Sequence, residues 1–252
     1  MSQWMEHWSQ IDLDGHECEV FEPTEVNSAG WVLIYLHGVH EGSLRDQAVF
    51  SQQFQRHGLP VICPRTGPTW WTDRICPAFD SHFTAEDYVC RRVMRYVARR
   101  WRAVPPAIGL FGSSMGGQAA LRMAYKFPRM FPVVAALSPA IDYQIRYDEG
   151  DPIIRQMYDD AEAVRQDTAT LYVHPLNWPH HQFFCCDPTD DRWIESVERL
   201  QMKLQSLGIP HHCDLETIAG GHGFSYYNQM AARVIDFLVN GLTQLSEKSE
   251  SW

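Results

Sequence analysis

One serine of this chain lies in a local pattern that is typical of an activated nucleophile. Residues 112–117 read GSSMGG, so Ser114 matches the serine of G-x-S-x-G. An apolar run of strand length, 107–111, precedes this pattern, and helix-forming residues, 118–125, follow it. In such a strand–turn–helix unit the serine is held on a strained backbone above the carboxyl end of a sheet, where glycines let the two backbones pass closely. The pattern predicts that Ser114 attacks an acyl group, although a glycine-rich turn alone would also account for a serine there.

A serine hydroxyl needs a base within hydrogen-bonding reach, because it is hardly ionised at neutral pH. Of twelve histidines, His222 has the position that this role requires. It lies between glycines in GGHGF, 220–224, after the last predicted strand and before the last predicted helix. This is the third place in the order Ser, Asp, His. The adjacent histidine pairs at 180–181 and 211–212 have poor geometry for sharing a metal ion, so no metal site is predicted.

Three aspartates compete to orient this histidine, all in the segment CDPTDDR, 186–192. Asp190 is preferred, because a loop of a few residues lets its carboxylate turn back toward His222. Asp187 is the alternative, although its side chain could instead cap the turn at the end of the strand. Asp191 is expected to be the N-cap of the next helix. An interpretation in which all three are turn and cap residues remains open.

Acyl transfer also needs backbone N–H groups directed at the oxyanion of the tetrahedral intermediate. The amide of Met115, directly after the serine, is one candidate. The amide of Val39 is the other, in YLHGVH, 35–40, where Gly38 lets the chain approach the site. The alternative is that this segment is only the exit turn of a strand.

Side chains that could form a substrate pocket follow two of the predicted strands. His40 follows the first of them, and Trp70, Trp71 and Arg74 follow the second. The two tryptophans with the arginine could line an acyl or aromatic pocket. Equally, one tryptophan could pack under the loop as local core, and Arg74 could pair with a neighbouring aspartate.

Composition excludes several classes of partner. The 252 residues include 31 acidic and 21 basic side chains, a formal net charge of −10, so neither a nucleic acid nor an anionic membrane is expected as a partner. The arginines clustered within 91–102 are interpreted as a solvated helix face.

The sequence shows no secretory signal and no bilayer-spanning run. The seven cysteines include the adjacent Cys185 and Cys186, interpreted as small buried hydrophobes, so a cytoplasmic protein is predicted.

Strand and helix signals alternate along the chain. Strands are predicted at 30–36, 59–63, 107–111, 131–137, 182–186 and 213–218, and helices at 43–57, 84–102, 118–125, 192–207 and 226–242. Apolar strands that alternate with helices indicate one α/β domain over 1–252, with a doubly wound, mostly parallel sheet. The irregular stretch 140–179 is predicted to be a small inserted lid, and the polar tail 245–252 is predicted to be frayed. Ligands of such sheets bind at the carboxyl ends of the strands, where all the candidates above are expected.

Taken together, the His37–Gly38 pair, the GSSMGG turn, the Asp190 loop and the GGHG segment resemble the α/β-hydrolase superfamily. The resemblance covers 16–242 and is closest to the esterase branch that includes esterase D and S-formylglutathione hydrolase. It implies a nucleophile at Ser114, a base at His222, an acid at Asp190 and oxyanion amides at Val39 and Met115. It further implies hydrolysis of small-molecule carboxylic esters or thioesters through an acyl-enzyme, without a metal or organic cofactor. Asp187 replaces the strand-ending glycine that is usual in this family.

Two other functions stay open from the sequence. A serine peptidase of the prolyl-oligopeptidase type would share the fold and the serine turn, but such enzymes generally carry a large added domain for which this chain has no room. A non-catalytic binding protein could use the same scaffold, although the complete Ser, His and Asp set argues against it. The sequence leaves the acyl and alcohol halves of the substrate and the oligomeric state undetermined.

Overall fold

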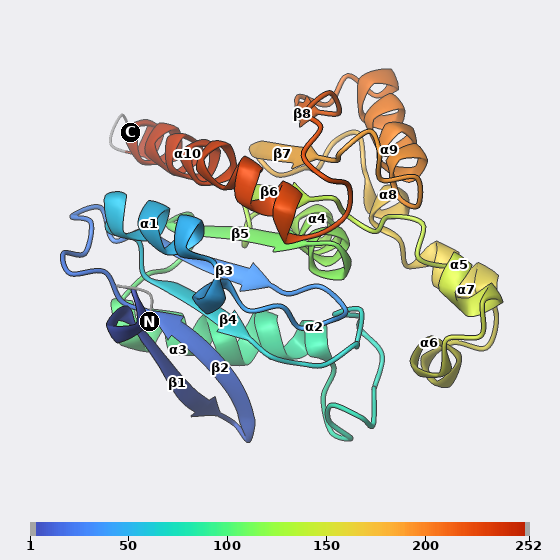
Figure 1. The fold of residues 1–252 in the computed structure, drawn as a ribbon, viewed down its shortest axis with the longest axis horizontal. Coiled ribbons are helices and arrows are strands. Elements are labelled where there is room, and N and C mark those ends of the chain that lie inside the picture. Colours follow the sequence, from blue (N-terminus) through green and yellow to red (C-terminus); the bar gives the residue numbers. More distant parts are fainter. Residues whose placement is uncertain (1–3, 250–252) are drawn as a thin grey trace.

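The computed structural model describes residues 4–249, which form an eight-stranded sheet between two layers of helices (Figure 1). The strand order is β1-β2-β4-β3-β5-β6-β7-β8. Strand β2 runs antiparallel to both of its neighbours, β1 and β4, whereas β3 to β8 are parallel to one another. The strands are β1 (Trp8–Leu13), β2 (His16–Phe21), β3 (Val32–Leu36), β4 (Val61–Pro64), β5 (Ile108–Ser113), β6 (Val133–Leu137), β7 (His181–Cys185) and β8 (His212–Asp214). This confirms the predicted mostly parallel α/β sheet and adds an N-terminal hairpin, β1–β2, that the sequence analysis does not predict.

Helices cover both faces of the sheet. On one face, α1 (Ala48–Arg56) packs against α10 (Phe224–Ser249). The other face is covered by α3 (Met94–Trp101), α4 (Met115–Lys126) and α9 (Ile194–Ser206). A chain that crosses repeatedly from one face to the other gives the doubly wound arrangement expected of alternating strands and helices.

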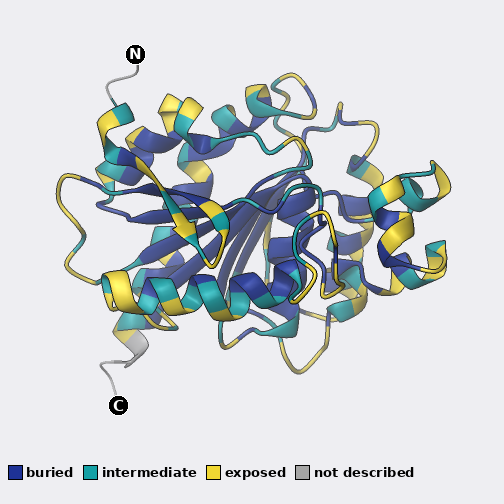
Figure 2. Cartoon of the chain, turned by 90° about the horizontal axis from the view of Figure 1, so that it is seen from below, coloured by how far each residue is buried: buried dark blue, intermediate teal, exposed yellow. Residues whose placement is uncertain are grey.

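The central strands are apolar throughout because both of their faces are buried. In β3, Leu33 and Tyr35 belong to the core beneath α1 and α10, whereas Val32, Ile34 and Leu36 belong to the core beneath α3 and α4. Figure 2 shows the strands buried in the middle of the molecule and the exposed positions on the outer sides of the helices. Successive side chains point to opposite faces of a strand, so a continuous apolar run fills two cores at once.

Two predicted C-terminal ends differ from the structure by several residues. The strand predicted at 213–218 ends at Asp214, whose carboxylate accepts hydrogen bonds from the amides of Glu216 and Thr217 and turns the chain. The predicted frayed tail is helical up to Ser249, because Leu245 extends the apolar face of α10 into the core. Residues 250–252 of that tail lie outside the described part of the chain.

Short helical turns complete the fold. The helix predicted over 84–102 consists of three successive pieces, α2, a π-helical turn and α3. The short elements are Met5–His7, Leu44–Asp46, α2 (Ala85–Asp87), the π-helical turn Tyr88–Val93, α5 (Ile145–Asp148), α6 (Pro152–Met157), α7 (Ala161–Gln166) and α8 (Ala169–Tyr172). Helices α5 to α8 lie between β6 and β7, where the inserted lid is predicted, and α5, α6 and α7 lie together at one end of the molecule (Figure 1).

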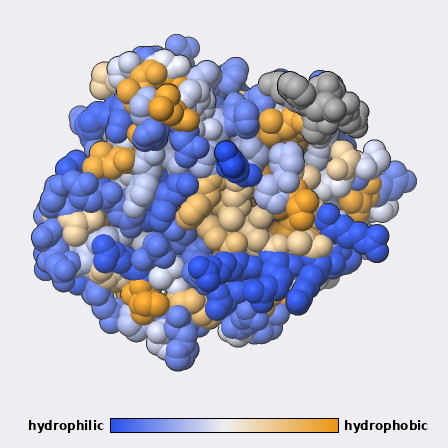
Figure 3. All heavy atoms as spheres, turned by 180° about the vertical axis from the view of Figure 1, so that it is seen from behind, coloured by the Kyte–Doolittle hydropathy of each residue, from blue (hydrophilic) through white to orange (hydrophobic). Residues whose placement is uncertain are grey.

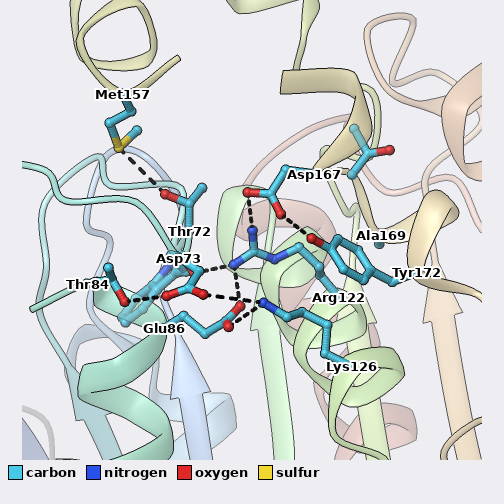
Figure 4. Close-up of polar contacts among 12 residues, drawn as sticks. Thr72, Asp73, Thr84, Glu86, Arg122, Lys126, Met157, Asp167, Ala169 and Tyr172 are labelled. Atoms are coloured by element: carbon cyan, nitrogen blue, oxygen red, sulfur yellow. Dashed lines mark hydrogen bonds and ion pairs between the residues drawn. The ribbon is translucent and has the colours of Figure 1, made fainter. Parts of the chain in front are cut away.

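A buried arginine joins this insert to the rest of the protein (Figure 4). Arg122 of α4 is fully buried, and its guanidinium lies 2.9 Å from a carboxylate oxygen of Glu86 on α2 and 2.7 Å from one of Asp167 after α7. It also donates a hydrogen bond of 2.6 Å to the carbonyl of Trp71, and Lys126 makes a second ion pair with Glu86. Burial would lower the pKa of Arg122, but the charges of Asp167 and Glu86 outweigh burial and raise it. One cation therefore holds three segments together.

The surface of the described residues is mixed in character. Figure 3 shows an apolar area bordered by strongly hydrophilic residues on the face opposite to that of Figure 1. Within the arginine cluster, Arg91 and Arg92 both pair with Asp87, and Arg100 pairs with Glu22, so neighbouring acids neutralise these charges. Across residues 4–249, the structure contains no helix with the length and apolar character needed to cross a membrane.

Replacement of Arg122 by methionine, Arg122→Met, is expected to destabilise the fold strongly. The change leaves the buried carboxylates of Glu86 and Asp167 without their main partner, which costs on the order of 3–5 kcal/mol. For a chain of this size each kcal/mol lowers the melting temperature by about 2–4 °C. Thermal unfolding of Arg122→Met should be compared with Arg165→Met, which breaks only the exposed pair with Glu162 and should change little. Equal melting temperatures of the two variants would contradict a stabilising role for the buried cluster.

Candidate active site

Ser114 lies at a sharp turn between β5 and α4, as its sequence pattern predicts. Its backbone has φ 54° and ψ −117°, a left-handed conformation that is strained for serine, and its amide donates a hydrogen bond of 2.8 Å to Leu137. The close approach needs glycine at both ends of the turn. A Cβ atom on Gly116 would lie 1.9 Å from the carbonyl oxygen of Leu36, and one on Gly112 would lie 2.3 Å from the carbonyl oxygen of Gly116.

His222 links Ser114 to Asp190 through both ring nitrogens. Its Nε2 lies 2.8 Å from Oγ of Ser114, and its Nδ1 lies 2.6 Å from Oδ2 of Asp190. Asp190 follows β7, is nearly fully buried and therefore presents its carboxylate to the histidine rather than to solvent. A carboxylate only accepts hydrogen bonds, so Nδ1 carries a proton and Nε2 is free to accept the proton of the serine.

Asp187, the alternative acid, does not contact His222. Its buried carboxylate accepts hydrogen bonds from the amide and hydroxyl of Thr189, at 2.8 and 2.7 Å. It also accepts from the amides of Ala219 and Gly221, at 2.7 and 2.9 Å. Burial would raise the pKa of Asp187, but these hydrogen bonds outweigh burial and lower it to about 2. Asp187 thus fixes the loop that carries the histidine.

Asp191, the third aspartate of this loop, does not cap the next helix. Helix α9 begins at Ile194, and its N-cap residue is Trp193, which makes no side-chain capping bond. The predicted N-cap role of Asp191 is therefore wrong, because the helix begins further along the chain than the sequence suggests.

The loop after β3 is fixed next to Ser114 by a neutral histidine. The Nε2 of His37 accepts a hydrogen bond of 3.1 Å from the amide of Thr66, and its Nδ1 lies 2.8 Å from the carbonyl oxygen of Gly38. Burial lowers the pKa of His37 to about 4, so the ring is uncharged at neutral pH. A Cβ atom on Gly38 would lie 3.3 Å from the Cβ of Ser114. The following residue, Val39, lines the cavity at the serine.

A cavity of about 470 Å³ opens beside Ser114 and His222. Two of the four predicted pocket residues, His40 and Trp70, line it. The ring of Trp70 is held in place by stacking on Tyr143, with 4.6 Å between the ring centres.

The other two residues predicted as possible pocket residues, Trp71 and Arg74, do not line this cavity, and Trp71 matches the alternative in which one tryptophan is local core. Trp71 is fully buried, and its indole donates to the carbonyl of His37. The side chains of Trp70 and Trp71 diverge where the backbone passes through two left-handed residues. Arg74 lies over the ring of Tyr158 instead, outside the cavity wall.

Several residues that line the cavity are not predicted from the sequence. They are Arg146, Arg192, Trp193, Phe224 and Tyr227. Phe224 and Tyr227 open the helix directly after the histidine loop, and this proximity in sequence is a signal that could have indicated them. Arg146 comes from the irregular insert, where no periodic pattern places a side chain. Arg146 and Arg192 both pair with the carboxylate of Glu149, so their charges are partly neutralised. Among residues 4–249, no group of three or more His, Cys, Asp or Glu side chains could hold a metal ion.

Comparisons with known proteins agree with this architecture. The sequence profile of the family described as Putative esterase matches residues 20–236. An S-formylglutathione hydrolase of Paracoccus denitrificans is 25% identical over 169 residues, which are 59% of this chain and 60% of the relative. One of Bos taurus is 27% identical over 128 residues, 43% of this chain and 45% of the relative. The chain thus matches less than two thirds of the length of either curated relative.

Solved structures show the same fold. The S-formylglutathione hydrolase of Staphylococcus aureus has a TM-score of 0.72 at 18% identity, with 93% of this chain and 100% of that chain covered. The profile match covers most of the chain and includes the serine turn, the Asp190 loop and the histidine loop. This chain therefore belongs to the Putative esterase family and has the α/β-hydrolase fold that its strand order and serine turn indicate.

Proposed function

We propose that this protein is a serine hydrolase that cleaves carboxylic esters or thioesters of small substrates through an acyl-enzyme on Ser114. The observation that carries the proposal is the continuous chain of hydrogen bonds from Ser114 through His222 to Asp190. A serine on a strained turn, a base within reach and a carboxylate that orients the base are the parts that nucleophilic catalysis needs. Membership of an esterase family supports the same chemistry and does not favour a peptidase or a non-catalytic protein.

In the first half of the reaction, Oγ of Ser114 attacks the carbonyl carbon as its proton passes to Nε2 of His222. The buried carboxylate of Asp190 holds the ring in the required tautomer and stabilises the imidazolium that forms. The bond to the leaving oxygen or sulfur then breaks, and Nε2 returns the proton to the leaving group. Water repeats the sequence on the acyl-enzyme and releases the acid.

The amides of Val39 and Met115 are proposed to stabilise the oxyanion. Val39 lies in the cavity wall on the loop that Gly38 brings against Ser114. Met115 is the first residue of α4, so its amide is at the positive end of that helix. Donors at fixed positions stabilise the transition state more than the ground state, because negative charge on the oxygen develops during attack.

The largely apolar and aromatic cavity supports small esters or thioesters as substrates. The two curated relatives act on S-formylglutathione according to their names, and this supports a thioester among the substrates of this chain. The insert 140–179 is proposed to act as the cap of the site, since Arg146 on α5 contributes to the cavity wall. A cytoplasmic location is proposed because all seven cysteines are free thiols, as is usual in a reducing compartment.

Replacement of the nucleophile, Ser114→Ala, is expected to lower turnover of p-nitrophenyl acetate by at least about 10³-fold, because no acyl-enzyme can form. The same variant should lose covalent labelling by a fluorophosphonate. The matched control is Ser113→Ala, which removes the neighbouring hydroxyl that bonds to Tyr35 and should keep the labelling. Wild-type turnover by Ser114→Ala would refute the proposed mechanism.

Substitution of the two buried aspartates is expected to have different effects: Asp190 supports catalysis, whereas Asp187 supports the stability of the fold. Asp190→Asn should reduce kcat by about 10⁴-fold with little loss of stability, because the amide favours the wrong tautomer of His222. Asp187→Asn should instead lower the free energy of unfolding, because an amide cannot replace all four hydrogen bonds of the carboxylate.

The stability difference between wild type and Asp187→Asn should depend on pH. The folded pKa of Asp187 is about 2, below its unfolded value, so its contribution is present above about pH 4 and is lost as the pH falls toward 2. Urea unfolding at pH 7 and pH 3, together with ester hydrolysis, measures both effects. A greater loss of kcat in Asp187→Asn than in Asp190→Asn would reverse the assignment of the acid.

A further inference from the structure

A second hydroxyl reaches the nitrogen of His222 that faces the nucleophile. The OH of Tyr227 lies 3.1 Å from Nε2, the atom that is also 2.8 Å from Oγ of Ser114. Tyr227 lines the same cavity, and its ring stands edge-on to the imidazole with 5.9 Å between the ring centres. It is therefore next to the site of proton transfer, although the triad does not require it.

The position of this tyrosine is rigidly defined. Its amide bonds to the carbonyl of Gly223 at 3.0 Å in the first turn of α10, and its ring packs edge-on against Phe224. Phe224 in turn fills the space left by Gly42, where a Cβ atom would lie 2.4 Å from its ring. Tyr227 as a whole is 4% exposed, and its hydroxyl lies against the histidine at the cavity.

Tyr227 stays protonated during the reaction. Burial raises its pKa well above the usual value, and the negative charge of Asp190 acts in the same direction. Its hydroxyl can therefore donate one hydrogen bond and accept others, but it is not a base. An unprotonated Nε2 has one lone pair in the ring plane, so Ser114 and Tyr227 cannot both donate to it at full strength.

This competition changes when the serine becomes acylated. In the free enzyme Oγ of Ser114 has a proton to donate to Nε2. In the acyl-enzyme that oxygen carries the acyl group and has no proton, so His222 loses this partner. Tyr227 remains beside Nε2, at the place where a water molecule must enter to be deprotonated.

We propose that Tyr227 is a positioning residue for hydrolysis of the acyl-enzyme: its hydroxyl exchanges its contact with Nε2 for a hydrogen bond to the attacking water and holds that water against Nε2. This inference rests on the proposed serine hydrolase function. Water gives one proton to Nε2, and its oxygen bonds to the acyl carbon as the carbonyl electrons move to the oxyanion. The bond from carbon to Oγ of Ser114 then breaks, the proton on Nε2 passes to that oxygen, and the acid is released. Tyr227 keeps its own proton throughout.

The variant Tyr227→Phe separates the two halves of the reaction. With p-nitrophenyl acetate, kcat/KM reports acylation, whereas kcat reports deacylation when that step is slow. Loss of one hydrogen bond to the water should lower kcat by about tenfold. KM should fall in parallel, and kcat/KM should stay within about threefold of wild type. Stopped-flow measurement should show a burst of nitrophenolate followed by the slower steady rate.

The matched control is Tyr226→Phe, which removes the adjacent buried hydroxyl beside Cys185. It should retain the kinetic constants of wild type, and the melting temperatures of both variants verify that they fold. Displacement of His222 by a packing defect would slow acylation and deacylation together, since both use Nε2. An equal fall in kcat and kcat/KM for Tyr227→Phe, or no change in either, would overturn the inference.

The proposed function is tested separately from this inference. If wild type turns over the ester and is labelled by the fluorophosphonate, and Ser114→Ala does neither, the hydrolase mechanism is supported whatever Tyr227→Phe shows. If wild type and Ser114→Ala behave alike, the proposed function fails, and the role of Tyr227 fails with it.

Discussion

The geometry around Ser114 depends on backbone segments that lie closer together than any side chain would permit. The strand before the serine, the helix after it and the end of β3 meet where Gly112 and Gly116 present no Cβ atom. This contact forces the serine into its left-handed conformation and lifts Oγ off the edge of the sheet toward His222. The sheet supplies the rigid base, because its central strands are buried on both faces. The backbone strain at Ser114 is thus maintained by the packing of the hydrophobic cores on the two faces of the sheet.

Loops fixed by buried polar groups place the remaining parts of the site. Asp187 binds two amides of the histidine loop, and His37 binds the amide of Thr66 while facing the carbonyl of Gly38. Each of these groups is shifted to the charge state that suits its partners, the carboxylate ionised and the imidazole neutral. Ser114, His222 and Asp190 are therefore oriented by neighbouring groups outside their own chain of hydrogen bonds, which is how rigid sites maintain short hydrogen bonds.

The sequence predicts the elements better than the cavity. Ser114, Asp190 and His222 are identifiable because parallel strands end at a common edge, so residues that follow different strands meet there. The hairpin β1–β2 is missed because its paired strands lie outside the alternating pattern. Trp71 does not line the cavity, because the backbone is left-handed at Trp70 and Trp71 and the two side chains have different surroundings. Arg74 lies over Tyr158, a contact with the insert that local sequence does not indicate. The role of Arg146 depends on tertiary packing of the insert, and local sequence carries little information about such packing.

The buried position of Arg122 also has a consequence for how the insert is held beside the cavity. Its ion pair with Asp167 ties the insert to α4, the same helix that follows the nucleophile. Outward rotation of the insert would separate opposite charges in a medium of low polarity, which is costly. The same ion pair therefore favours one position of the insert relative to the helix that begins at the serine turn.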